Sequence, residues 1–272
     1  MDNYSVLMSV YHKEKAEFLR EALDSIWNQT VQTNDFVLIC DGPLNEELDR
    51  VIDENVKAHP DVLHVVRLEK NGGLANALNI GIKLCKNELV ARMDSDDISY
   101  PDRCERQLKI FEARDDVDLV SGTIEEFIEN MDVIESRREM PQEPEDVYEY
   151  CKKRCPFNHP CIMYKKTAII ESGGYIPSHI EDYYLWVRVL QHGFRGYNIK
   201  ESLLWMRAGA DMYKRRGGKK YAESVKALFK YMRDTGFITK WQYFKRMNMR
   251  YAGALAPNWL RKFLYKTLLR KS

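Results

Sequence analysis

The sequence predicts an α/β fold, in which helices cover both faces of a mostly parallel sheet. Over residues 1–98, apolar runs of strand length alternate with amphipathic stretches of helix length. This alternation is typical of repeated strand–helix–strand units, which build parallel sheets. The chain has 272 residues, 44% of them hydrophobic, which is enough for one large domain or for a domain with an appendage.

The first part of the chain contains the clearest elements. The run FVLIC is followed by DGP, a typical strand end, and AEFLREALDSIWNQ brings Leu19, Leu23 and Ile26 to one helical face. The other segments show similar patterns. The predicted strands are 5–10, 36–40, 62–68 and 88–93, and the predicted helices are 16–29, 44–58 and 72–84.

The later elements are more varied. In the predicted helix 181–193, Leu185 and Val189 face inward, with Trp186 as a further candidate, and Gly193 ends the helix. From about Lys219 the pattern is purely helical. The remaining predictions are a helix at 102–114, a strand at 118–129, a loop at 141–147 leading into a helix, a strand, short helix and glycine turn over 159–175, a strand at 203–207, and helices at 219–234, 239–254 and 258–270.

Polar side chains follow the predicted strands at one edge of the sheet. Tyr11, Asp41, Asn71 and Asp94 all lie at or just after a strand end. In open α/β sheets, ligands bind beyond the carboxyl ends of the strands. We therefore expect these four residues to lie around one ligand site.

The stretch VARMDSDDIS places Asp94, Asp96 and Asp97 within four positions. Carboxylates this close repel one another, and a D-x-D at a strand end offers oxygen ligands to a divalent cation such as Mg²⁺ or Mn²⁺. The alternative is that the segment DDISYPD (96–102) caps the following helix and favours its dipole. Both interpretations can hold, with Asp96 on a metal and Asp97 nearer the helix.

Two further motifs have a functional and a structural interpretation. NGGLANALNIG (71–81) allows a ligand to approach the backbone closely and offers a helix N-terminus to phosphate, or it is a glycine turn before an ordinary helix. Within it, Gly81 in mid-helix indicates close packing or a nearby ligand. In EDYYLW, Glu181 and Asp182 suit a helix start, and either is also a candidate general base.

Several of these motifs together resemble the family 2 glycosyltransferases with the GT-A fold. The similar strings are SVLMSVYHKEKAEFLREALDSIWNQT, KNGGLANALNIGIKLCKNELVARMDSDDISYPDRCERQ, and HPCIMYKKTAIIESGGY with EDYYLWVRVLQHG. The similarity covers about residues 4–207 and is greatest to bacterial capsule, O-antigen and exopolysaccharide transferases. It implies a GT-A catalytic domain at 1–211, with a nucleotide-sugar-binding half (1–98) and an acceptor-binding half (99–211), and a basic helical extension at 212–272.

The resemblance also implies an activity. The activity would be the inverting transfer of a sugar from a UDP-linked nucleotide sugar to an acceptor hydroxyl. The acceptor would be a lipid-linked glycan in surface-polysaccharide biosynthesis.

One rival class is a nucleotidyltransferase, but the glycine-rich basic loop expected after its first strand is replaced here by YHKEKAEF. A sugar-nucleotide-binding protein without activity is the other rival, and the intact D-x-D with Glu181 and Asp182 argues against it.

The resemblance assigns roles to individual residues. Asp182 would be the catalytic base, with Glu181 beside it. Asp96 would bind the metal, Mn²⁺ or Mg²⁺, directly, while Asp94 would face the ribose or the metal. Asp41 would hydrogen-bond the nucleobase. The residues expected to bind the nucleotide sugar are Ser9, Tyr11, Asp41, Asn71, Gly72, Gly73, Asn79 and Asp94. The residues expected to bind the acceptor are His159 and Trp186. Three arginines, Arg207, Arg215 and Arg216, either contact the diphosphate or form a solvated basic loop.

The net charge of +1 hides an asymmetry. Residues 1–211 contain 25 Lys and Arg against 39 acids, whereas 212–272 contain 17 against 2. In this tail Leu260, Phe263 and Leu264 recur at helical spacing among basic residues, as in a helix that lies in a membrane interface. The alternative is an apolar stripe packed on the catalytic domain. Polyprenyl-linked acceptors of the similar enzymes favour the membrane, and no nucleic-acid-binding module is recognisable.

The sequence also predicts a location. The segment MDNYSVLMSV lacks the pattern of a signal peptide, and no run of eighteen apolar residues is present. The six cysteines are expected to be reduced, mostly buried thiols, with only weak support for zinc at Cys151 and Cys155. We therefore expect a cytoplasmic protein, peripheral on the cytoplasmic face of the inner membrane.

Overall fold

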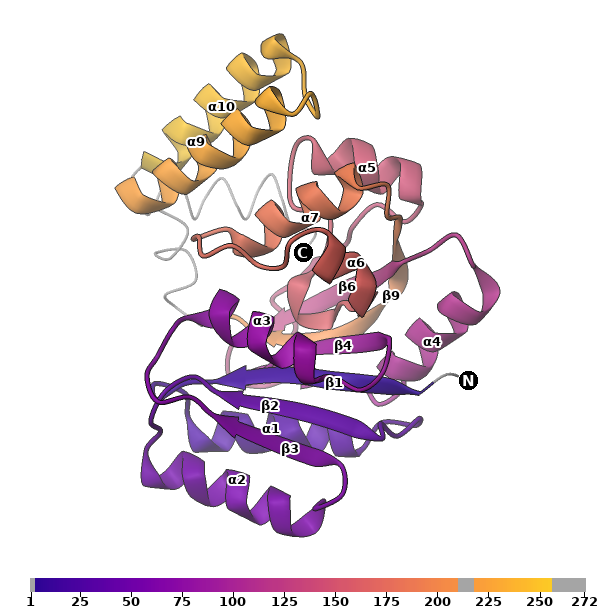
Figure 1. Cartoon of the computed structure of the whole chain (residues 1–272), viewed down its shortest axis with the longest axis vertical. Helices are drawn as coiled ribbons and strands as arrows, with labels where there is room; N and C mark the ends of the chain where they lie inside the picture. The colour runs from indigo at the N-terminus through magenta and orange to yellow at the C-terminus, as the bar shows by residue number, and fades with distance from the viewer. Residues whose placement is uncertain (1–2, 210–217, 256–272) are drawn as a thin grey trace.

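The predicted alternation of strands and helices is present in the computed structural model, which describes residues 3–209 and 218–255 (Figure 1). Each predicted element of residues 1–98 is found within two residues of its expected start. These elements are β1 (Tyr4–Val10), α1 (Ala16–Trp27), β2 (Asp35–Cys40), α2 (Glu46–Ala58), β3 (Leu63–Arg67), α3 (Leu74–Leu84) and β4 (Leu89–Asp94).

The rest of the chain adds shorter strands and more helices. The short strands β5 and β7 were not predicted, and β9 is longer than its expected range because it continues through a bulge containing exposed Lys200 and Glu201. The elements are β5 (Ile98–Ser99), α4 (Arg103–Ala113), β6 (Leu119–Phe127), β7 (Ser136–Arg138), α5 (Pro144–Cys151), the 3₁₀ turn η1 (His159–Cys161), β8 (Met163–Lys165), α6 (Lys166–Glu171), α7 (Glu181–Gln191), β9 (Gly196–Arg207), α9 (Lys219–Asp234) and α10 (Lys240–Leu255).

All strands belong to one nine-stranded sheet of order β3-β2-β1-β4-β8-β6-β9-β5, with β7 paired to β6. The pairs of β1 with β2 and β4, and of β2 with β3, are parallel as predicted. In the second half β8 runs antiparallel to both β4 and β6, whereas β6 and β9 are parallel. The parallel half thus brings the carboxyl ends of β1, β2 and β4 to one edge.

Helices cover both faces of this sheet (Figure 1). One core cluster packs α1, α2 and α4 against the sheet, and the other packs α3, α5, α6, α7 and α9 against the opposite face. In α3, a Cβ on Gly81 would lie 2.3 Å from Leu7 Cδ1 and 3.0 Å from Ile39 Cγ1, so the glycine lets the helix approach the sheet closely. Close packing therefore explains Gly81.

The C-terminal helices lie beside α5 and α7 as an antiparallel pair (Figure 1). Val225, Leu228, Phe229 and Met232 of α9 are buried in the same core cluster as α7. The packing alternative therefore holds for α9, and the division at 211/212 is not a boundary between cores. No helix in the described ranges is long and apolar enough to cross a membrane. The predicted helix 258–270 with its apolar stripe, including Leu268, and the residues Arg215 and Arg216 lie outside the described residues.

Candidate active site

The acidic cluster follows β4 at the edge where the parallel strands end. One carboxylate oxygen each from Asp94, Asp96 and Asp97 lies within 4.8 Å of the others. Burial, and then the charges of Asp96 and Asp94, raise the pKa of Asp97 well above its usual range. A divalent cation accepts this oxygen-only donor set and relieves the repulsion, so these residues fit the predicted metal.

The helix-capping alternative holds in part. Asp102, at the end of DDISYPD, is the N-cap residue of α4, although its side chain makes no capping hydrogen bond, whereas β5 separates Asp97 from the helix. Asp97 instead points inward and accepts a hydrogen bond from the backbone N–H of Arg207 (2.9 Å). A bound divalent cation would account for the crowding of the three acids.

Arg207 at the end of β9 holds the acidic loop in place. Its Nε donates to the carbonyl of Asp96 (3.2 Å), and its guanidinium pairs with Glu21. The same group lies over the rings of Phe18 and Phe127, 3.9 and 4.7 Å from their centroids. Arg207 is therefore neither a solvated basic residue nor, in this arrangement, directed to a diphosphate: its hydrogen bonds fix the backbone around the acids.

Arg92 lies beneath the cluster and was not predicted as a site residue. It is 1% exposed and pairs with Asp94, two residues later on the same face of β4. Burial by itself would lower the pKa of Arg92, but the adjacent Asp94 carboxylate outweighs it and raises the pKa. The signal was present in the sequence, because a charged residue in an otherwise apolar strand needs a buried partner.

The second predicted cluster joins the end of β2 to the start of α3. The Asp41 carboxylate accepts hydrogen bonds from the backbone N–H groups of Gly72 (2.7 Å) and Gly73 (2.9 Å), and Asn71 donates its side-chain amide to the carbonyl of Asp41 (3.0 Å). A Cβ on Gly42 would lie 2.6 Å from the backbone nitrogen of Asn71. The two loops are therefore in direct contact, and the predicted base-binding role of Asp41 stays a prediction.

Ser9 and Tyr11 lie at the end of the neighbouring strand. Ser9 is opposite Asp94 in the β1–β4 register and opposite Ile39 in the β1–β2 register, and Tyr11 is 41% exposed. The strand ends that carry Ser9, Asp41 and Asp94 are therefore adjacent, as predicted.

A half-buried side-chain amide links this edge to the second half of the protein. The Asn79 amide makes two hydrogen bonds to the backbone of Tyr175, at 2.8 and 2.7 Å, and so ties α3 to the glycine turn. The Tyr175 hydroxyl lies 3.0 Å from His159 Nε2. Burial and the positive charge of Arg92 hold the pKa of His159 well below its usual range, so the imidazole is neutral at pH 7.

The acids that begin α7 lie close to the same network. Burial raises the pKa of Glu181 to about 7, and the charges of Asp182 and Asp94 act in the same direction. Asp182 accepts hydrogen bonds from the backbone N–H of Tyr183 (2.7 Å) and from the thiol of Cys155 (3.4 Å). Asp182 is therefore held by two donors of the protein at the start of α7.

Trp186 does not have the predicted acceptor-binding position. It is completely buried, and its ring packs edge-on against Phe157 and His159, 5.5 and 5.9 Å between centroids. A buried ring cannot contact an acceptor, so Trp186 supports His159 from below. His159 itself is 9% exposed, and its acceptor-binding role stays a prediction.

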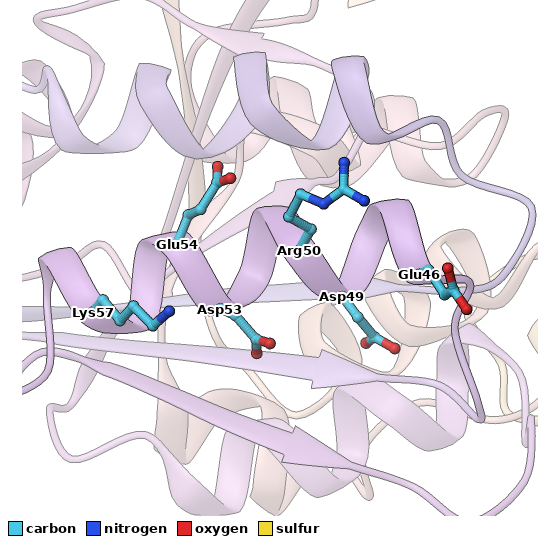
Figure 2. Close-up of a pocket in the computed structure, with 6 residues that line it drawn as sticks. All are labelled: Glu46, Asp49, Arg50, Asp53, Glu54 and Lys57. Atoms are coloured by element: carbon cyan, nitrogen blue, oxygen red, sulfur yellow. The ribbon is translucent and has the colours of Figure 1, made fainter.

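A surface hollow of about 390 Å³ lies away from these residues, on the outside of α2. Figure 2 shows its charged side chains spread along the helix. Arg67 pairs with Asp49 and Asp53 there, so the charges neutralise one another at the surface. We assign no ligand to it, because small-molecule sites are mostly apolar with a few convergent polar groups. The residues that line it are Glu46, Asp49, Arg50, Asp53, Glu54 and Lys57.

The fold is the GT-A fold, and solved structures agree with it. A mannosyltransferase from Pyrobaculum calidifontis, solved with GDP-Man and Mn²⁺, has a TM-score of 0.64 at 18% identity and is aligned over 94% of this chain and 70% of its own. TarS of S. aureus (residues 1–349), solved with UDP-GlcNAc, has a TM-score of 0.65 at 16% identity over 98% of this chain and 76% of its own.

The sequence comparisons identify the family. Residues 5–173 match the model of "Glycosyl transferase family 2". The amylovoran biosynthesis glycosyltransferase AmsE of Erwinia amylovora is 36% identical over 97% of this chain and 98% of its own. The Escherichia coli UDP-Gal:alpha-D-GlcNAc-diphosphoundecaprenol beta-1,3-galactosyltransferase is 37% identical over 98% and 97%. The chain therefore belongs to glycosyl transferase family 2 and is a glycosyltransferase, which rules out the nucleotidyltransferase alternative.

Proposed function

We propose that the protein is an inverting, metal-dependent transferase that moves a hexose from a UDP-sugar to a hydroxyl of a glycan carried on a polyprenyl diphosphate. One observation carries this proposal. One carboxylate oxygen each from Asp94, Asp96 and Asp97 lies within 4.8 Å of the others after β4, and the acid pair Glu181–Asp182 begins α7 in the other half of the fold. This arrangement supports a cation site for the donor and a general base for the acceptor.

Two relatives support the choice of substrates. The E. coli galactosyltransferase, by its name, uses UDP-Gal and an acceptor linked to diphosphoundecaprenol, and it is 37% identical over nearly the whole chain. AmsE is named for amylovoran biosynthesis. Because the identity is this high over nearly the full length, we propose a UDP-sugar donor and a lipid-linked acceptor for this chain as well.

The proposed residue roles follow from the geometry. Asp96 and Asp94 would hold a Mn²⁺ or Mg²⁺ ion, which supplies positive charge for the departing diphosphate. Asp182 takes the proton of the acceptor hydroxyl as its oxygen bonds to the anomeric carbon and the carbon–diphosphate bond breaks on the opposite face. Ser9, Tyr11, Asp41 and Asn71 to Gly73 line the nucleotide side of this site.

A panel assay tests the proposal. Purified protein is incubated with UDP-glucose, UDP-galactose, UDP-GlcNAc, UDP-GalNAc or GDP-mannose, each with Mn²⁺ or EDTA, and with a short-chain prenyl-diphosphate-linked N-acetylglucosamine as acceptor. We expect transfer from one donor with Mn²⁺ and none with EDTA, with inversion at the anomeric carbon visible by NMR of the product. Transfer only from GDP-mannose, or equal transfer in EDTA, would overturn the proposal.

We also propose that α10 lies against an anionic membrane surface on the cytoplasmic face of the inner membrane. This helix packs inward through Tyr243 and Met247. Its outer side exposes Trp241 (72%), Phe244 (60%) and Met249 (67%). No acid follows Asp234 in the sequence. Exposed aromatic side chains beside basic ones are typical of interfacial helices, since the rings enter the headgroup region while the cations meet anionic lipid.

Vesicle flotation tests this contact. The wild-type chain should float with vesicles containing phosphatidylglycerol and remain below with pure phosphatidylcholine. The double variant Trp241→Ser, Phe244→Ser should float less, whereas the matched pair Ile170→Ser, Ile176→Ser, exposed on other parts of the surface, should behave as wild type. Equal flotation of both variants would exclude α10 as the membrane contact.

A further inference from the structure

The turn between α5 and η1 approaches the proposed catalytic base. The Cys155 Sγ lies 3.4 Å from Asp182 Oδ2 and 3.5 Å from the carbonyl oxygen of Phe157. On the other carboxylate oxygen, Asp182 accepts the backbone N–H of Tyr183 (2.7 Å). Each oxygen of the base is therefore held by one donor of the protein, which leaves its remaining lone pairs for a substrate hydroxyl.

The thiol has one proton and two possible acceptors. A hydrogen bond to an ionised carboxylate is stronger than one to a neutral carbonyl, so the thiol proton is directed to Asp182 while that group is charged. Once Asp182 has taken the acceptor's proton, the Phe157 carbonyl becomes the better partner. The two acceptors thus let the thiol stabilise the charged base and release it when the charge is neutralised.

The turn is held in place from two sides. The Tyr183 hydroxyl donates to the carbonyl of Cys151 (2.6 Å), which joins the end of α5 to the first turn of α7. Arg246 of α10 donates to the carbonyl of Lys152 (2.8 Å), so the C-terminal helix pair fixes the same turn. These two contacts, from α7 and α10, fix the start of the turn that carries Cys155.

We propose that Cys155 is a positioning residue for the transfer reaction: its thiol donates a hydrogen bond to Asp182, orients the carboxylate and favours its charged form. This inference rests on the proposed function, because it gives Asp182 the role of base. It assigns to Cys155 a function that burial and packing alone do not require, since Cys155 is the one cysteine of six that is only partly buried.

A labelling experiment tests the contact without any substrate. Burial and the charge of Asp182 both raise the pKa of the Cys155 thiol well above its usual range. In Asp182→Asn the charge is absent, so the pH midpoint of Cys155 alkylation by iodoacetamide should move down and labelling at pH 8 should rise at least about threefold. The five buried cysteines serve as internal references. A change in accessibility alone would scale the rate at every pH, and an unmoved midpoint would overturn the proposal.

Kinetics then test the role. With the donor identified in the panel, Cys155→Ala should lower kcat roughly threefold to tenfold at nearly constant donor KM, since a hydrogen bond to a charged group is lost. The acidic limb of the pH profile should move to higher pH, and Cys155→Ser, whose hydroxyl also donates, should restore both. If Asp182→Asn is inactive while Cys155→Ala matches wild type, this inference fails and the proposed function stands. If Asp182→Asn remains active, the proposed function fails instead.

Discussion

The two halves of the molecule build their parts of the site in different ways. In residues 1–98 the candidate residues follow directly from parallel strands in register: Ser9 lies opposite Asp94, and Asp41 follows the strand paired next to it. In the second half they come from a helix start, a 3₁₀ turn and a glycine turn, joined by contacts such as Cys155 to Asp182. Sheet topology therefore determines where the candidate residues of the first half lie, whereas individual side-chain contacts determine where those of the second half lie.

This difference separates binding from chemistry. The strand-end half carries the acids suited to a cation and the loops around Asp41, whereas the other half carries the acids suited to proton transfer. Substitutions in the two halves should therefore affect different measured quantities. The following predictions test this separation.

The largest effect is expected for Asp182→Asn in the second half. Without a base for the acceptor hydroxyl, kcat should fall on the order of a thousandfold, while the Kd of UDP measured by calorimetry should stay near wild type. The exposed Asp146→Asn on α5 is the matched control and should keep full activity. Normal turnover of Asp182→Asn would contradict the assignment of proton transfer to the second half.

The next effect is expected for Asp96→Ala in the first half. Loss of one carboxylate from the cluster should weaken the binding of UDP in the presence of Mn²⁺ on the order of a hundredfold. The binding measured in EDTA should be almost unchanged, and Asp115→Ala, an exposed acid elsewhere, should bind like wild type in both conditions. Equal Mn²⁺ dependence in Asp96→Ala and wild type would show that the ion binds elsewhere.

A smaller effect is expected for Gly42→Ala, which tests how closely the first-half loops pack. Gly42 has φ +89°, and a Cβ there would lie 2.6 Å from the backbone of Asn71. We expect a loss of about 2–4 kcal/mol in the free energy of unfolding, with weaker UDP binding. Gly193→Ala also has a positive φ (+91°) but no atom within 4 Å of its Cβ, so it should lose only about 1 kcal/mol.

The smallest effect concerns Glu181 and pH. The pKa of Glu181 is about 7 in the folded protein, above its ordinary value of 4.5. The contribution of the protonated carboxyl to the free energy of unfolding is therefore complete below about pH 4.5 and is lost as the pH rises through 7. Glu181→Gln keeps the neutral form at every pH. It should therefore be more stable than wild type by about 1–2 kcal/mol at pH 8 and equal to it near pH 4.5, by denaturant unfolding. The same difference at both pH values would contradict the burial of this carboxyl.

The contrast between the halves also explains what the sequence could predict. Asp41, Asn71 and Asp94 were found because strand ends can be read from periodicity and because parallel strands end at one edge. Arg92 was missed although its position in an apolar strand indicated a buried partner. Trp186 was misassigned although helical spacing already made it a candidate for the inward face.

The contacts of the second half could not be predicted in this way. Arg207 meets Asp97 across 110 residues, and Asn79 meets Tyr175 across 96. Such pairings depend on how loops pack in three dimensions, and no local spacing encodes them. For the same reason the sequence could not indicate the contact of Cys155, which was considered only with Cys151 as a weakly supported zinc ligand. The structure places its thiol beside Asp182.

The central claim is a cation position at Asp94, Asp96 and Asp97 after β4. Crystals grown with Mn²⁺ and UDP, measured at the manganese absorption edge, test it directly. We predict an anomalous peak at ordinary Mn–O distances from the Asp96 carboxylate, bridged to the UDP diphosphate, with the nucleobase beside the loop of Asp41. A peak elsewhere, or UDP bound away from the acids with no ion between them, would contradict the account.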